Sequence, residues 1–146
     1  MAITSAICNS FKQEILEAEH NFTASTGNTF NLALYTSSAT LGAGTTAYTT
    51  TEEITNTSGT AYTAKGKALT SVTPTLDSTT AVCDFADVSW TSASFTANGC
   101  LIFNDSHSTD AAVCAVAFGG DKTVSSGTFT IQFPAAAATT AIIRIA

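Results

Sequence analysis

The stretch from Trp90 to Asp121, WTSASFTANGCLIFNDSHSTDAAVCAVAFGGD, holds the densest apolar runs of the chain. These runs are Cys100–Phe103 and Ala111–Phe118, and the polar segment Asn104–Asp110 lies between them. Two apolar runs joined by a short polar loop are typical of a β-hairpin. We therefore predict a central hairpin here, followed by a turn at Gly119–Asp121.

The composition favours one all-β domain. The chain has 146 residues, which suits a single domain spanning 1–146, and 45% of them are apolar. Only 11% are charged, against about 25% in typical soluble proteins. Thr and Ser replace much of the missing charge, and the β-branched Thr suits strands. A neutral, hydroxyl-rich surface suits a protein packed among copies of itself or against a partner, and it equally suits a secreted domain.

The charge balance argues against two classes of partner. The net charge is -6 and the five Lys and Arg are scattered along the chain, whereas a nucleic-acid surface needs clustered basic residues. No apolar run reaches the roughly 18 residues of a membrane-spanning helix. The N-terminus lacks the basic and apolar regions of a Sec signal peptide. We therefore expect neither nucleic acid nor a membrane as partner, and if the protein leaves the cell we expect a route other than Sec secretion, of which lysis is one.

One amphipathic helix is predicted near the N-terminus, over residues 4–22. Its apolar residues recur at the spacing of a single helical stripe. They are Ile7, Phe11, Ile15, Ala18 and Phe22. Such a helix either docks on the sheet of its own chain or forms an arm that inserts into a neighbouring subunit.

Short strands are predicted over the rest of the chain, residues 29–146, from apolar–polar alternation with a period of two. Besides the hairpin, they are Phe30–Tyr35, Gly59–Gly66 at a sheet edge, Ala68–Val72, Ala81–Phe85, Val88–Phe95, Gly127–Phe133 and Ala141–Ile145. A turn containing Pro74, Asp77 and Ser78 would join two of them. Seven to nine short antiparallel strands with one helix predict an all-β sandwich or barrel-like domain, with Trp90 as a core anchor.

The four cysteines are predicted to be buried thiols. Cys8, Cys83, Cys100 and Cys114 include no C-x-x-C pair, so zinc-ribbon spacing is absent. Each lies in or beside an apolar run, where Cys behaves as a small hydrophobe. If 104–110 is the hairpin loop, Cys100 lies opposite Cys114, and a disulfide between these two is the alternative.

No other pattern predicts chemistry. His107, with Asp105 and Asp110, lacks the ligand spacing of an EF-hand loop, which favours a solvated hairpin tip. His20, near the end of the predicted helix, is either solvated or docked. There is no G-x-S-x-G elbow and no P-loop. We therefore predict no enzymatic activity, no cofactor and no metal site.

Several stretches, taken in order over nearly the whole chain, resemble a small virion structural protein family of tailed bacteriophages, of the marine and cyanobacterial type. They are SFKQEILEAEHNF, NTFNLALYTSSATLGAGTTAYTT, GTAYTAKGKALTSVTPT, DFADVSWTSASFTANGCLIFND, VAFGGDKTVSSGTFTIQFP and AIIRIA. The resemblance implies a virion component without catalytic residues.

Two functions follow from this resemblance. One is a capsid cement or decoration protein that stabilises the shell through many contacts with the major capsid protein and with copies of itself. The other is a tail, neck or fibre component, such as a tube or host-adhesion module that contacts tail proteins. A secreted β-sandwich binding module is a third hypothesis. The side chains expected at an interaction surface are Ile7, Phe11, Ile15, Phe22, Tyr48 and Tyr62.

Overall fold

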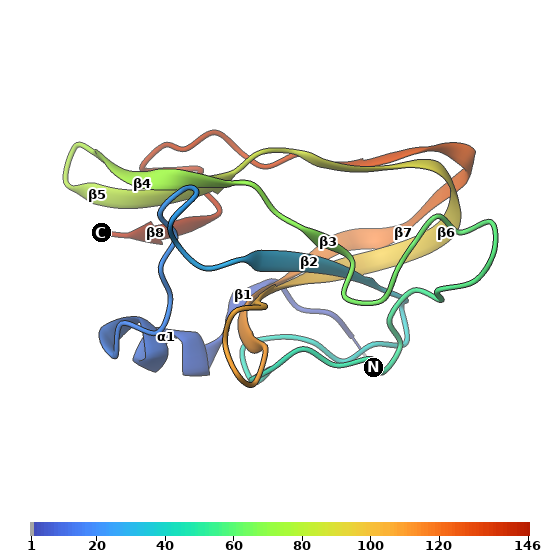
Figure 1. The fold of residues 1–146 in the computed structure, drawn as a ribbon, viewed down its shortest axis with the longest axis horizontal. Helices are drawn as coiled ribbons and strands as arrows, with labels where there is room; N and C mark the ends of the chain where they lie inside the picture. The colour runs from blue at the N-terminus through green and yellow to red at the C-terminus, as the bar shows by residue number, and fades with distance from the viewer. Residues whose placement is uncertain (1) are drawn as a thin grey trace.

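The computed structural model describes residues 2–146 and consists of two antiparallel sheets with one short helix (Figure 1). The larger sheet has the order β1-β7-β6-β2-β3, and the smaller has the order β4-β5-β8. The predicted all-β, sandwich-like fold is thus confirmed. The elements are β1 (Ala6–Ile7), α1 (Asn9–Leu16), β2 (Phe30–Tyr35), β3 (Lys67–Ala68), β4 (Ser71–Asp77), β5 (Thr80–Phe85), β6 (Val88–Asn104), β7 (Ala111–Ile131) and β8 (Ile143–Ile145).

The central hairpin is present and is longer than predicted. β6 and β7 have 17 and 21 residues. They pair from Asn104↔Ala111, beside the connecting loop, to Val88↔Ile131 at the far end. The segments predicted as separate strands, Val88–Phe95 and Gly127–Phe133, belong mostly to the outer half of this same ribbon.

The ribbon bends where we predicted a turn. Its register changes from Gly99↔Ala117 to Ala97↔Lys122, so residues 118–121 of β7 lie opposite the single residue 98 of β6. Gly119 and Gly120 have φ values of 75° and 144°, which favour glycine. The prediction of a turn is wrong, because pairing with β6 continues on both sides of this bulge. In Figure 1 the yellow and orange strands bend here and return over the sheet.

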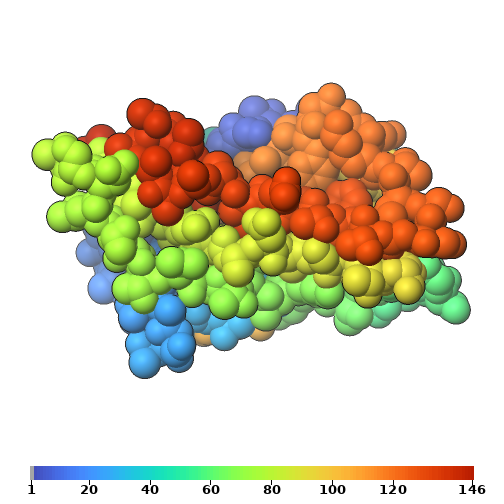
Figure 2. Space-filling view, turned by 90° about the horizontal axis from the view of Figure 1, so that it is seen from above, coloured from blue at the N-terminus to red at the C-terminus, as the bar shows by residue number. Residues whose placement is uncertain are grey.

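The bend produces two layers, which we call the base and the return layer. The base contains β2 with residues 99–104 of β6 and 111–117 of β7, and the return layer contains residues 88–97 and 122–131. Viewed from above, the return layer lies at the surface, with the red C-terminal segment and the green β4–β5 hairpin at one end (Figure 2). Trp90 in this layer is 1% exposed, which confirms it as a core anchor.

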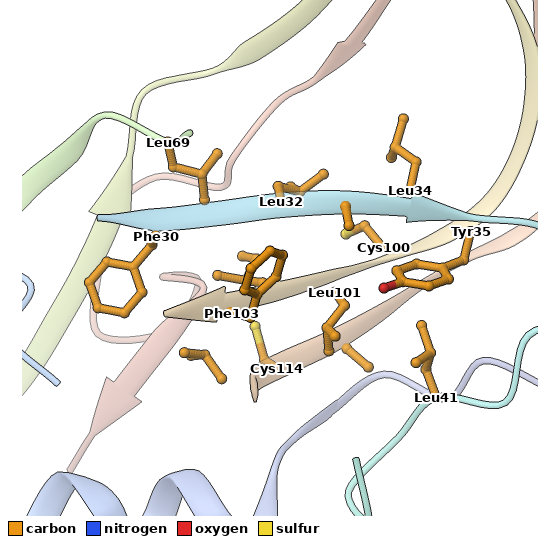
Figure 3. Packing of buried hydrophobic residues seen from close by; sticks show 14 of the residues in the cluster. Phe30, Leu32, Leu34, Tyr35, Leu41, Leu69, Cys100, Leu101, Phe103 and Cys114 are labelled. Atoms are coloured by element: carbon orange, nitrogen blue, oxygen red, sulfur yellow. The ribbon is translucent and has the colours of Figure 1, made fainter. Parts of the chain in front are cut away.

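Both faces of the base are covered. All six residues of β2 are buried. Leu32, Leu34 and Cys100 lie on the face toward the return layer, and Tyr35 and Leu101 lie on the opposite face (Figure 3). That opposite face is covered by residues 2–8 and 36–50, which are joined to each other and to β7 by backbone hydrogen bonds.

The predicted helix over 4–22 is wrong in both its bounds. α1 covers only Asn9–Leu16, because residues 6 and 7 instead pair with β7 as strand β1. The helix ends at Leu16 with Glu17 as its cap, and Ala18 has a positive φ of 61° that helical backbone does not allow. Beyond it the chain is irregular, and the Phe22 ring stacks on Phe30 with the centroids 4.2 Å apart.

Two smaller strand predictions also differ from the structure. The predicted edge strand Gly59–Gly66 is a loop with turns. Pro74 lies inside β4 rather than in the β4–β5 turn, which is formed by Ser78 and Thr79. β4 tolerates proline because it is the edge of its sheet, and its register shifts between Val72 and Thr75.

Candidate functional site

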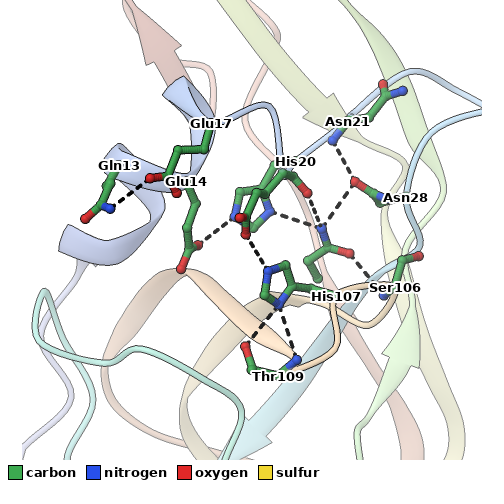
Figure 4. A network of polar contacts seen from close by, with 11 residues as sticks. Gln13, Glu14, Glu17, His20, Asn21, Asn28, Ser106, His107 and Thr109 are labelled. Atoms are coloured by element: carbon green, nitrogen blue, oxygen red, sulfur yellow. Dashed lines mark hydrogen bonds and ion pairs between the residues drawn. The ribbon is translucent and has the colours of Figure 1, made fainter.

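A network of polar side chains fastens α1 to the tip of the central hairpin (Figure 4). His20 donates from Nε2 to Glu14 Oε2 at 2.8 Å, and Asn104 Nδ2 lies 3.1 Å from His20 Nδ1. Because the Asn104 Oδ1 atom accepts from the Ser106 backbone, its amide group presents Nδ2 to the ring, and the imidazole proton lies on Nε2. The His20 side chain is fully buried, so this histidine is docked rather than solvated.

The second histidine continues the network toward the surface. His107 Nε2 lies 2.5 Å from Glu19 Oε2, its Nδ1 accepts from the Thr109 backbone, and its ring stacks 6.2 Å from that of His20. The hairpin tip is solvated as predicted, since Ser106, Ser108 and Thr109 are exposed, and His107 is half-buried within it. The imidazoles are held by hydrogen bonds within the chain, and this arrangement accounts for the docking of α1.

A second cluster centred on Glu53 holds the long loop between β2 and β3. The Glu53 carboxylate accepts from Tyr48 Oη at 2.5 Å, Tyr62 Oη at 2.7 Å and the Lys65 backbone N–H at 2.8 Å. Burial, together with the bond to Glu53, raises the pKa of Tyr48 to about 12 and the pKa of Tyr62 further. Tyr62 is 2% exposed and Tyr48 is half-buried against the core. The prediction that Tyr62 lies at an interaction surface is therefore wrong.

Lys65 joins that loop to the central hairpin. Its Nζ lies 2.8 Å from carboxylate oxygens of both Asp105 and Asp110, at the two ends of the hairpin loop. These hydrogen bonds raise the pKa of Lys65. The acidic residues considered for a cation loop thus bind a lysine. Among residues 2–146, no group of three or more His, Cys, Asp or Glu side chains is placed to hold a metal ion.

All four cysteines are buried and free. Cys100 lies opposite Val116, and Cys114 lies opposite Ile102, so the two thiols are not a cross-strand pair. The predicted alternative, a Cys100–Cys114 disulfide, is wrong. It assumed that Cys100 pairs with Cys114, and the observed register is shifted by two residues, so that Cys100 pairs with Val116. Burial raises the pKa of Cys100 to about 12, which suppresses thiolate chemistry.

The predicted helical arm docks on its own chain. Phe11 is 3% exposed and Phe22 is also buried, so neither is available to another molecule. Ile7 lies in β1, opposite Cys114. Ile7 and Ile15 are both half-buried, and Ile15 lies at the border of a hollow.

That hollow is an apolar groove of about 560 Å³ between α1 and the small sheet. Phe11 and Ile15 form one side, and Ala81, Cys83 and Ile145 form the other. Three large apolar side chains are exposed on the elements that frame it, α1, β4 and β8. Leu16 is 88% exposed, Ile145 is 57% exposed, and Leu76, which lies opposite Ala81 in the β4–β5 register, is 72% exposed.

A second hollow, of about 680 Å³, lies between the base and the return layer, and we call it the interlayer cleft. Ile102 and Val116 of the base face Phe129 and Ile131 of the return layer across it, and Lys122 lies at the bend of the ribbon. The sequence signals neither hollow.

Three comparisons with known proteins complete the description of the chain. No family model, no curated protein and no solved structure matches it. In addition, none of the helices in the described residues is both long and apolar enough to cross a membrane. The two hollows are therefore the features from which function has to be argued.

Proposed function

We propose that this protein is a non-enzymatic structural subunit of a tailed-phage particle, a cement or decoration protein that stabilises the capsid shell. The observation that carries the proposal is the groove between α1 and the small sheet, which Ile145 lines, together with the exposed Leu16 on α1 and Leu76 on β4, the elements that frame it. Large apolar side chains gathered at one hollow are typical of a protein–protein contact. The partner is the major capsid protein, with further copies of this chain as neighbours.

The way in which the groove is framed supports a protein partner. α1 is fixed to the sheet by the buried Phe11 and by the hydrogen bond from His20 to Glu14, so its exposed end does not have to be ordered on binding. A pre-organised surface loses little conformational entropy when it binds. On a symmetric shell a modest contact of this kind is repeated in every copy, and neighbouring contacts multiply its effect.

A tail, neck or fibre component is the second candidate, and one observation favours it. β1 pairs with β7 only at Ala115 and Cys114, so the outer edge of β7 from residue 118 to 131 has no strand partner within residues 2–146. Open strand edges allow subunits to join into rings or tubes. Copy number in purified particles separates a shell or tube protein, with many copies, from a fibre or adhesin with few.

The test uses particles of the phage that encodes the chain, grown without this protein and then mixed with recombinant protein. Stoichiometry is measured on the purified particles. We expect Leu16→Ser and Ile145→Ser each to weaken binding about tenfold or more, because each removes a large apolar side chain from the contact.

The matched control is Val72→Ser. Val72 is exposed like Ile145. Leu76 pairs with Ala81, which lines the groove, whereas Val72 pairs with Asp84. Residues 81 and 84 are three apart on β5, so Val72 is on the other face of the sheet. Equal binding by all three variants, or absence of the protein from native particles, contradicts the proposal.

A further inference from the structure

The interlayer cleft has the size and the walls of a ligand site. Its volume of about 680 Å³ falls within the roughly 300–1,000 Å³ of small-molecule pockets. Ile102 and Cys100 of the base are buried on its floor, whereas Phe118, Phe129 and Ile131 are half-exposed along it. Large apolar side chains therefore line a space that the chain itself does not fill.

The bend of the ribbon keeps this space open. The register change around Gly119 and Gly120 puts four residues of β7 opposite one of β6, so the return layer starts away from the base. On the β6 side the return layer is covered by the β2–β3 loop, where the Tyr62 ring packs on Trp90 and Phe95. On the β7 side the two layers diverge, and the cleft lies there.

The charge of the cleft selects the ligand. Lys122 is the one charged residue that lines it, and no carboxylate does. Each of the other three lysines has a polar partner: Lys12 binds Asn9, Lys65 binds two aspartates and Lys67 binds a backbone carbonyl. Within residues 2–146, the Lys122 Nζ atom has no hydrogen-bond or ion-pair partner, although its backbone pairs with Ala97. A single ammonium group at the end of an apolar cleft, in a protein of net charge -6, complements an anion with an apolar body.

We propose that the interlayer cleft binds a free single-chain fatty carboxylate. The hydrocarbon chain lies between Ile102 and Val116 on one side and Phe129 and Ile131 on the other, and the carboxylate lies at Lys122 Nζ. The proposal is independent of the particle role, because it concerns the cleft and not the groove beside α1.

Methyl NMR of the full chain provides the test, with sodium dodecanoate added below its micelle concentration. The methyl signals of Ile102, Val116 and Ile131 should shift with saturation, while those of Ile15 and Ile143 in the α1 groove serve as internal controls and stay in place. The matched cation, dodecyltrimethylammonium, should bind at least about fivefold more weakly, since it has the same chain and the opposite charge.

Two substitutions test the two halves of the proposal. Lys122→Gln should weaken dodecanoate binding about fivefold, as expected for an exposed ion pair, and Lys12→Gln, on α1, should leave it unchanged. Ile142→Trp fills the cleft from its half-buried border and should abolish the methyl shifts, with the melting temperature reporting whether the variant is folded. If that variant does not fold, the methyl shifts of the unsubstituted protein still show whether dodecanoate binds in the cleft.

Several results would overturn the proposal. One is a shift of the groove methyls alone, and another is equal affinity for the anion and the cation. If the cleft methyl signals shift when the protein concentration is raised in the absence of dodecanoate, a second copy of the protein occupies the cleft. Cosedimentation with phosphatidylglycerol vesicles, without shifts from free dodecanoate, would show that a membrane surface is bound instead.

Discussion

Replacing Tyr62 with Phe isolates the hydrogen bonds that hold the long loop onto the sheet. The Tyr62 hydroxyl donates to Glu53 Oε1 at 2.7 Å and accepts from the Leu34 backbone N–H at 2.9 Å. Leu34 is in β2, which lies between β6 and β3 in the larger sheet, and it is fully buried. The substitution keeps the ring and its packing on Trp90, so it leaves no large cavity.

The expected loss of stability follows from these two bonds. Without the hydroxyl, the Leu34 N–H loses this partner in a site that water does not reach, and an unsatisfied buried group costs about 1–3 kcal/mol. The bond to the Glu53 carboxylate is charge-assisted and contributes about 1.5–3 kcal/mol. Since the two share one atom, their contributions do not add fully, and we expect the free energy of unfolding to fall by about 2–4 kcal/mol.

The measurement is urea unfolding, compared with Tyr48→Phe. Tyr48 also donates to Glu53, at 2.5 Å, but it is half-buried and makes no bond to a strand backbone, so its loss should cost about 1 kcal/mol. If Tyr62→Phe costs no more than Tyr48→Phe, the Leu34 bond is not a determinant of stability and the reasoning fails.

Four further predictions concern stability and the thiols. Trp90→Ala should destabilise the protein by about 3–5 kcal/mol in chemical unfolding, and an unchanged melting temperature would contradict its place in the core. Gly66→Ala should lower the free energy of unfolding by about 3 kcal/mol or more, because φ at this residue is 66° and a Cβ would overlap the Leu32 carbonyl oxygen. The control Gly44→Ala has open space around its Cβ position and should be nearly neutral. Folding raises the pKa of Tyr48 from 10.0 to about 12 and that of Cys100 from 9.0 to about 12. Their protonated forms therefore stabilise the fold below pH 9, and this stability should be lost as the pH rises from about 9 to 12. A melting temperature that stays constant up to pH 12 would refute this prediction. Thiol titration should count four groups after denaturation without reductant, and slow reaction of all four before it; two groups would indicate a disulfide.

Local periodicity predicted the strand β2 and the central hairpin, and it failed where pairing between distant residues competed with it. Phe30–Tyr35 was predicted with its observed bounds. The stripe from Ile7 to Phe22 has true helical spacing, but pairing of β1 with β7 removes its first residue and the irregular backbone after Ala18 removes its last. Helical propensity is a weak term beside the burial of Phe22 against Phe30.

The bends of the central ribbon could not be predicted in the same way. Gly119 and Gly120 are a sound turn signal, yet a turn and a bulge require the same glycine backbone. Only the continued pairing of residues 122–131 with β6 separates the two, and this pairing joins residues far apart in the chain. A similar irregularity at Ser92, with a φ of 50°, breaks the alternation predicted for Val88–Phe95 and buries Ala93.

The candidate surfaces were missed for a related reason. Sequence reasoning assigned apolar and aromatic side chains to an interaction surface by their type, and Phe11, Phe22 and Tyr62 proved to be core. The side chains that are exposed, Leu16 and Leu76, carry no signal of their own. Whether an apolar side chain is exposed depends on whether another part of the chain packs over it, and that depends on how the layers of the whole molecule are arranged.

The openness of the α1 groove is itself a consequence of the polar network. The inner half of the small sheet is covered by aromatic rings, with Phe85 lying 6.2 Å from Phe22 and 5.4 Å from Phe133. The outer half, with Ile145, would be covered if the end of α1 moved toward it and buried Leu16. That movement would break the hydrogen bond between Glu14 and the buried His20. Keeping the buried imidazole satisfied therefore favours a position of α1 in which Leu16 and Ile145 stay exposed, and a second molecule could cover them without breaking this bond.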